Sequence, residues 1–213
     1  MRTKNIIIGF SSIMILIFLI MVFAMNRGDS IQLTGLQNTQ NPTTYLATSD
    51  NSPISGADDP KIVIYFFGDF GNTTSNTISS YIKTMLEKYP NDLAVVWKDY
   101  PNATLNDQSL NAAIAARCAQ KQDKFWEFHD ILIDNTDLLS NDLYGQLASQ
   151  LDLWEWSFNR CVEKQKTLSL VQDDILIAHE LSVIASPTLF INNKPISGYI
   201  SKQELEQLIL TAQ

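Results

Sequence analysis

The chain has 213 residues, of which 45% are hydrophobic and 18% charged, and its 15 basic and 23 acidic residues give a formal net charge of −8. This length allows one domain of ordinary size plus a tail. The acidic balance argues against nucleic acid and anionic lipid surfaces as partners, because both bind basic proteins by charge attraction.

An apolar run of 20 residues occupies positions 6–25. A helix over this run spans about 30 Å, the thickness of a bilayer core. Arg2 and Lys4 precede the run, which places the N-terminus in the cytoplasm by the positive-inside rule. Residues 22–24 resemble a signal-peptide cleavage site, but the apolar region of a signal peptide usually covers about 7–15 residues. We therefore predict an uncleaved anchor within residues 1–27. The protein is then a single-pass protein of the cell membrane whose C-terminal domain is extracytoplasmic.

A polar segment follows at residues 28–59. It is rich in Asn, Thr, Ser and Gln, contains Pro42 and Pro53, and shows no apolar periodicity. These properties are typical of a flexible linker. The folded domain is accordingly predicted over residues 60–213.

Apolar periodicity divides this domain into a β–α–β unit, a helical stretch and a closing β–β–α unit. Apolar residues in the first predicted helix recur at steps of three and four, so one of its faces is expected to cover a sheet. The predicted elements are strands at residues 61–67, 93–99, 188–191 and 194–196, helices at 73–88 and 202–210, and four or five further helices between Asp107 and Leu181.

Residues 65–75 read YFFGDFGNTTS and join the first predicted strand to the first predicted helix. This segment resembles the active site of the DsbA-like branch of the thioredoxin superfamily, which carries the motif Asp-Phe-x-Cys-x-x-Cys. Asp69 and Phe70 stand at the matching positions, but Asn72 and Ser75 replace the two cysteines. The resemblance therefore implies the family's fold, while these residues argue against its usual chemistry.

Further segments resemble the family in the same order along the chain. They are residues 93–101 (LAVVWKDYP), the helical segments 112–119, 124–130 and 151–161, and residues 185–194 (ASPTLFINNK). The resemblance thus covers most of the chain from about residue 60. It implies a thioredoxin-like α/β fold with an inserted all-helical subdomain at about residues 104–182.

Catalytic thiol–disulfide exchange needs a thiolate that attacks a disulfide sulfur, and a helix N-terminus favours that thiolate. An amide and a hydroxyl can neither form a thiolate nor attack a disulfide in this way, so no catalytic residue is predicted. The degenerate active-site positions are Asn72, Thr73, Thr74 and Ser75. We expect them to cap the helix, with anion binding at its free N–H groups as the alternative. Asp69 lies near the position of a buried acid that assists proton transfer to the thiols in the family. Without thiols, Asp69 has no such role.

Pro187 resembles the family's cis-proline, and the cis form costs little before proline. In relatives, the backbone just before this proline pairs with an extended substrate chain by strand addition. Ser186 would supply those main-chain groups here, so Ser186 and Pro187 are the predicted peptide-binding residues. The alternative is that Pro187 only shapes the turn before the following strand.

Cys118 and Cys161 are the only cysteines and lie in the helical insert by the family comparison. Disulfides persist outside the cytoplasm, where the predicted topology puts this pair. The resemblance implies a structural disulfide, since several DsbA-like proteins carry a second pair at matching places. Cys118 lies within an alanine-rich helix rather than at an exposed helix N-terminus. This position favours the structural disulfide over a relocated redox centre or two free thiols.

The other candidates for chemistry have structural explanations. His129 and His179 lie 50 residues apart without neighbours at metal-ligand spacing, so no metal site and no cofactor are predicted. Trp126, Trp154 and Trp156 are expected to pack in the core, with an apolar groove for a partner as the alternative. No Gly-rich phosphate loop, Gly-x-Ser-x-Gly elbow or His-Glu-x-x-His sequence is present.

These observations favour a membrane-anchored, redox-silent DsbA-like domain that binds extended or unfolded polypeptide, or an envelope protein. The first alternative is a thiol–disulfide oxidoreductase involved in disulfide-bond formation and acting through Cys118 and Cys161. The second is a tethered scaffold that uses an external surface. Reactivity of the cysteine pair separates the oxidoreductase from the others. Peptide binding beside Pro187 separates the binding domain from the scaffold.

Overall fold

We describe residues 51–102 and 108–212 in a computed structural model of the protein. The predicted anchor at residues 6–25 and most of the predicted linker lie outside these ranges. Inside them, no helix combines the length and the apolar character needed to cross a membrane.

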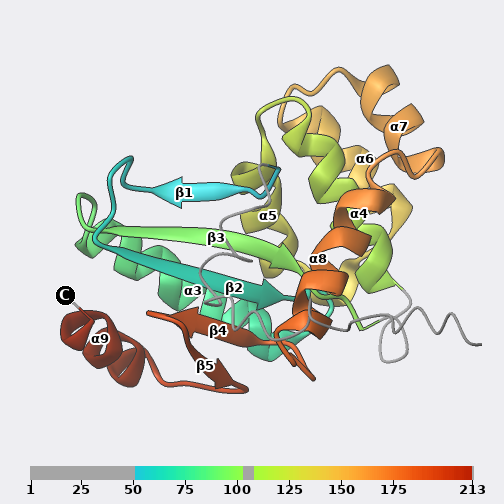
Figure 1. The fold of residues 1–213 in the computed structure, drawn as a ribbon. Helices are drawn as coiled ribbons and strands as arrows, with labels where there is room; N and C mark the ends of the chain where they lie inside the picture. Colours follow the sequence, from blue (N-terminus) through green and yellow to red (C-terminus); the bar gives the residue numbers. More distant parts are fainter. Residues whose placement is uncertain (1–50, 103–107, 213) are drawn as a thin grey trace, which may run out of the picture. The chain divides into compact units, whose positions relative to one another are not determined.

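Five strands form one sheet in the order β1-β3-β2-β4-β5 (Figure 1). The central strands β2 (Ile62–Gly68) and β3 (Leu93–Asp99) are parallel, and the crossover helix α3 (Thr73–Lys88) joins them, as parallel pairing requires. β4 (Thr188–Ile191) pairs antiparallel with β2, and β5 (Lys194–Ser197) pairs antiparallel with β4. The predicted thioredoxin-like order of elements is confirmed.

The sheet also reaches into the segment that was predicted as linker. β1 (Ile54–Gly56) pairs antiparallel with β3, and Ile54 stands opposite Val96. Gly56 has a φ of +116°, and a Cβ atom there would lie 2.3 Å from the carbonyl oxygen of Leu93. Only glycine fits this position. The linker prediction is therefore corrected at its end, since the fold includes residues before 60.

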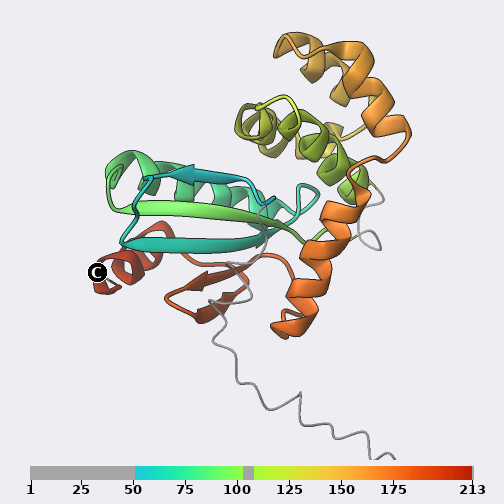
Figure 2. The ribbon, with the colours of Figure 1, turned by 45° about the horizontal axis from the view of Figure 1, so that its top comes forward.

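The predicted helical insert lies between β3 and β4 and leads back to the sheet through its last helix. Figures 1 and 2 show its helices grouped at the end of the sheet where β2 and β3 finish. Its elements are α4 (Gln108–Gln120), α5 (Phe125–Asp134), the 3-10 turn η1 (Thr136–Leu138), α6 (Asn141–Gln150), α7 (Glu155–Glu163) and α8 (Leu168–Glu180).

The two faces of the sheet are covered by different helices because side chains alternate along each strand. Phe66 of β2 belongs to a large core that includes Ile78 of α3, and α9 (Lys202–Thr211) packs beside α3. Phe67, the next residue of β2, belongs to a separate core with Ala178 of α8. The helix α3 and the loop before β4 are thus both anchored to β2, and this brings the candidate site together.

Helix α4 lies at the centre of the insert, where it contacts α5, α6, α7 and α8. Its alanine-rich stretch is buried, and small side chains allow neighbouring helices to approach closely. Cys118 of α4 and Cys161 of α7 form a disulfide with their Cα atoms 5.9 Å apart. The two residues are only 1% and 5% exposed.

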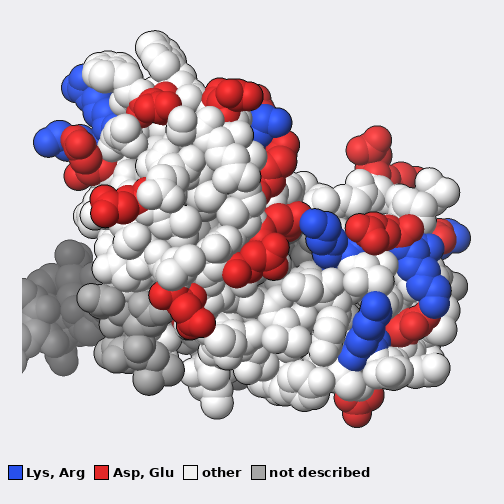
Figure 3. Space-filling view, turned by 180° about the vertical axis from the view of Figure 1, so that it is seen from behind, with Lys and Arg blue, Asp and Glu red and all other residues white. Residues whose placement is uncertain are grey.

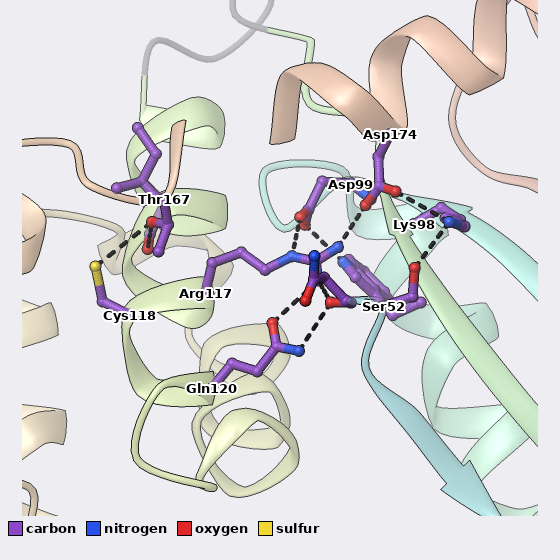
Figure 4. Close-up of polar contacts among 11 residues, drawn as sticks. Ser52, Lys98, Asp99, Arg117, Cys118, Gln120, Thr167 and Asp174 are labelled. Carbon is purple, nitrogen blue, oxygen red and sulfur yellow. Dashed lines mark hydrogen bonds and ion pairs between the residues drawn. The ribbon is translucent and has the colours of Figure 1, made fainter. Parts of the chain in front are cut away.

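Four buried charged residues connect the insert to the sheet (Figure 4). Arg117 of α4 donates hydrogen bonds to the carboxylates of Asp99 in β3 and Asp174 in α8. Lys98 donates to Asp174 across 3.1 Å and to Ser52 Oγ across 2.8 Å. Burial is tolerable because every charge has an oppositely charged partner. No sequence pattern predicted this cluster, which holds β3, α4, α8 and the start of the domain together.

The three tryptophans that were expected in the core do not share one environment. Trp126 is half-buried and donates from Nε1 to the carbonyl oxygen of Ile54 across 2.9 Å. Trp154 and Trp156 are 69% and 62% exposed, so the core prediction is wrong for both. Phe158 and Cys161 are the residues of α7 that are buried instead.

Candidate functional site

Helix α3 begins at the first degenerate position. Asn72 has extended backbone geometry, and its Oδ1 accepts hydrogen bonds from the N–H groups of Thr74 (2.9 Å) and Ser75 (3.1 Å). An N-cap residue satisfies free amides of the first turn in this way. The amide side chain therefore completes the helix end at which the family motif places its first cysteine.

The same side chain contacts the loop before β4. Asn72 Nδ2 donates to the carbonyl oxygen of Ser186 across 3.2 Å. The peptide bond between Ser186 and Pro187 is cis. Two segments separated by 114 residues in sequence, each predicted to belong to the site, thus meet at Asn72.

The remaining degenerate positions differ in their access to solvent. Thr73 is exposed and Thr74 is half-buried. Ser75 is fully buried, and among the described residues its Oγ has no hydrogen-bond partner. A buried hydroxyl without a partner costs stability. This position therefore tolerates a small side chain of low polarity.

Asp69 fixes the turn that precedes α3. It is 3% exposed, and its two carboxylate oxygens accept from the N–H groups of Gly71 (2.8 Å) and Asn102 (3.0 Å). Phe70 next to it stacks on Trp97 with ring centroids 4.9 Å apart. The carboxylate thus ties the turn to the end of β3, which is a structural task that needs no thiol.

Apolar side chains and a polar pocket surround the meeting point. Ile184, two residues before Ser186, is 88% exposed, and Leu138 of η1 is 63% exposed. A pocket of about 530 Å³ lies between the N-terminal half of α3 and the segment from the end of α5 to η1, and its lining includes Thr73 and Asp137. The surface around Asn72 can therefore contact both apolar and polar groups.

A second hydrogen-bonded cluster lies between α3 and α5. Nε2 of His129 is 3.0 Å from Ser79 Oγ, and Nδ1 is 3.0 Å from an oxygen of Asp130, which also binds Lys83. Burial lowers the pKa of His129, so its ring is neutral near pH 7. Nδ1–H then donates to Asp130, and Nε2 accepts from Ser79. These residues line a cavity of about 310 Å³.

No local sequence pattern indicates this cluster, because Ser79 lies mid-helix and 50 residues from His129. The sequence predicts a core or a surface position for each histidine. His129 is buried in the core, and His179 is exposed. Within residues 51–102 and 108–212, no three His, Cys, Asp or Glu side chains gather as a metal site would need.

The disulfide is separate from the α3 end. Its sulfurs belong to α4 and α7, and Cys118 Sγ lies 3.5 Å from the buried hydroxyl of Thr167. An attacking thiolate needs access to a disulfide sulfur. Both cysteines are buried in this structure. Figure 3 adds that one face of the domain mixes acidic and basic side chains without a continuous basic field.

Comparisons with known proteins agree with this fold. The thioredoxin family profile matches residues 48–210. Disulfide bond formation protein D of Bacillus subtilis is 25% identical over 166 residues, which cover 74% of this chain and 75% of that protein. Na(+)/H(+) antiporter NhaA 1 of Mycolicibacterium gilvum is 28% identical over 147 residues, or 68% of this chain. The chain spans only 24% of the length of that antiporter.

Solved structures share the fold at low sequence identity. A thioredoxin-like oxidoreductase from Silicibacter pomeroyi superposes with a TM-score of 0.71 at 19% identity, over 79% of this chain and 95% of that one. Oxidised BdbD from Bacillus subtilis gives a TM-score of 0.68 at 22% identity, over 76% and 92% of the two chains. At these identities the superpositions establish the architecture alone.

Proposed function

Since the chain belongs to the thioredoxin family as a DsbA-like member, we propose that it is a redox-silent, membrane-anchored form of that fold. In this proposal it binds extended or unfolded polypeptide, or an envelope protein, on the extracytoplasmic side. The observation that carries the proposal is Asn72, which stands at the first cysteine position and engages both its amide atoms in structural hydrogen bonds. No sulfur is available at this helix end, so binding is the property that the site retains.

Main-chain groups beside Pro187 support polypeptide binding. Strand addition uses backbone N–H and C=O groups and does not require a thiol. Among the described residues, the N–H of Ser186 has no hydrogen-bond partner, whereas its carbonyl accepts from Asn72. One of the two groups at Ser186 is thus open to an incoming chain. Exposed Ile184 beside it offers apolar contact area.

The apolar run at residues 6–25 supports the membrane anchor. The antiporter relatives support an envelope protein as an alternative partner, since a segment similar to this chain makes up about a quarter of their length.

Binding is tested by fluorescence anisotropy with labelled, reduced and carboxymethylated α-lactalbumin, an unfolded polypeptide without reactive thiols. The variant Ile184→Glu is expected to weaken binding about tenfold or more, because it removes apolar contact worth about 1.5–3 kcal/mol. Leu176→Glu on α8 is the matched control, since Leu176 is also exposed. Equal affinity of both variants and the wild type would show that the Pro187 loop does not bind polypeptide.

Redox silence is tested with insulin reduction and oxidation of a dithiol peptide. We expect the full chain to show no turnover above a variant that carries Cys118→Ala and Cys161→Ala. The alternative is a thiol–disulfide oxidoreductase that acts through this pair. Turnover that is lost in Cys118→Ala would establish that alternative and overturn redox silence.

A further inference from the structure

The start of α7 exposes two adjacent indole side chains. Trp154 and Trp156 are 69% and 62% exposed, and their ring centroids lie 5.9 Å apart. The guanidinium of Arg160 sits 5.3 Å above the Trp156 ring. Phe158 on the same helix is 1% exposed and packs inward, so α7 already has its core contacts without the indoles. The pair therefore forms an apolar surface beyond what the fold requires.

This surface lies close to the point where the chain enters the domain. Gln120, at the end of α4, donates from Nε2 to the carbonyl oxygen of Asn51 across 2.9 Å. Gln122, two residues later, accepts from the N–H of Trp154 across 2.8 Å. Arg117 also donates to the Asn51 carbonyl, at 2.9 Å. The same end of α4 thus holds both the first described residue and the tryptophan pair.

The length of chain before Asn51 limits how far the apolar run can lie from the C-terminal end of α4. Twenty-five residues, from 26 to 50, separate Asn51 from the apolar run at residues 6–25. A chain of this length can span at most about 80–90 Å. A bilayer that holds the apolar run is therefore within reach of the α4 end.

The chemistry of the pair fits the surface of a bilayer. Indole combines a large apolar ring with one N–H donor, which is why tryptophan gathers at membrane–water interfaces. The exposed charges from residue 152 to residue 166 are of both signs and equal in number: Arg160, Lys164 and Lys166 against Asp152, Glu155 and Glu163. A balanced surface matches zwitterionic headgroups rather than a strongly anionic surface.

We propose that Trp154 and Trp156 dock the domain on the outer surface of the bilayer that anchors the chain. The helix α8 then leads away from the lipid toward the Ser186–Pro187 loop, and its 13 residues span about 20 Å. Figures 1 and 2 both show α7 and the β4–β5 hairpin at opposite ends of the domain. Docking through α7 would keep the polypeptide site directed away from the membrane. This inference rests on the membrane anchor of the proposed function.

The test uses the full chain reconstituted in phosphatidylcholine vesicles that contain doxyl-labelled phosphatidylcholine. The chain has four tryptophans, and doxyl groups quench only those near the lipid. We expect quenching in the wild type and in the control Leu176→Ser, and loss of quenching in a double variant with Trp154→Ser and Trp156→Ser. Because both substitutions lie on exposed side chains, the fold should persist, and circular dichroism checks this.

Each other outcome overturns the inference in a distinguishable way. A chain that floats with the vesicles but shows no quenching keeps its anchor and does not dock through the pair. A chain that does not float loses the anchor, and with it this part of the proposed function, while polypeptide binding at Ile184 is measured independently. A wild-type dimer in detergent that becomes monomeric in the double variant would assign the pair to a second copy of the chain.

Discussion

Asn72 Nδ2 lies 3.2 Å from the main-chain oxygen of Ser186, so a side chain fills an acceptor that an incoming peptide N–H could use. The same residue caps α3 through its Oδ1 atom. A single amide thus serves the helix and the loop together. Substitutions that separate the two contacts show what each contributes.

Asn72→Ala removes both contacts, whereas Asn72→Asp keeps an oxygen for the cap and loses the donor to Ser186. We expect the alanine variant to lose about 0.5–2 kcal/mol of unfolding free energy in urea, and the aspartate variant to stay near the wild type. Both should bind unfolded polypeptide about two- to tenfold more tightly, because a hydrogen bond worth about 0.5–1.5 kcal/mol becomes available. Unchanged affinity in both variants would mean that the Ser186 carbonyl takes no part in binding.

Restoring the two sulfurs tests whether the helix end still activates a thiol. In the double variant Asn72→Cys with Ser75→Cys, we expect a thiol at position 72 with a pKa below the ordinary value of about 8.5, because α3 amides face that position. The thiol at position 75 should react slowly with iodoacetamide, since Ser75 is fully buried. Alkylation rates measured against pH give both results. Thr73→Cys, at an exposed neighbour, is the control, and equal pKa values at positions 72 and 73 would contradict the prediction.

The buried charge cluster predicts a large loss of stability on removal of one member. Arg117→Met leaves the carboxylates of Asp99 and Asp174 buried with only Lys98 as a cationic partner within the cluster. Breaking a buried pair in this way costs about 3–5 kcal/mol. Urea unfolding at pH 7 measures the loss, with exposed Lys166→Met expected to stay within about 0.5 kcal/mol of the wild type. A loss below about 1 kcal/mol for Arg117→Met would show that the cluster contributes little.

The sequence predicted the parts of the fold that have a clear apolar pattern. Strand β2 is a continuous apolar run, and helix α3 repeats apolar residues at steps of three and four, so the positions of both could be predicted. Strand β1 has three residues, too few for a period, and it forms because the edge of β3 is available to pair with it. The aromatic character of Trp154 and Trp156 predicts core positions for both. Helix α7 is short, however, and its buried face is formed by Phe158 and Cys161.

The site could be predicted only in part, for a related reason. The resemblance placed Asn72 at a degenerate active-site position and Ser186 in the peptide-binding loop, but the hydrogen bond between them depends on how one amide is oriented. The charge cluster could not be predicted from the sequence. Lys98 and Asp99 lie in strand β3, but their ion-pair partners lie in distant helices. Contacts between side chains that are far apart in sequence carry no local pattern that periodicity detects.

The neutral, buried ring of His129 predicts how stability depends on pH. Burial lowers the pKa of His129 in the folded chain, whereas the unfolded chain has a histidine pKa near 6.5. Above about pH 6.5 the ring is neutral in both states and the full stability is present. As the pH falls below that value, the unfolded state takes up a proton that the folded state does not, so the free energy of unfolding decreases.

We expect this loss between pH 7 and pH 5, with a slope of at most about 1.4 kcal/mol per pH unit for a single group. Urea unfolding at several pH values measures it. His129→Gln should flatten the profile, since glutamine keeps an amide for Ser79 but takes up no proton in this range. The exposed His179→Gln should leave the slope of the wild type unchanged. If His129→Gln and the wild type lose stability in parallel, carboxylates rather than this ring account for the acid sensitivity.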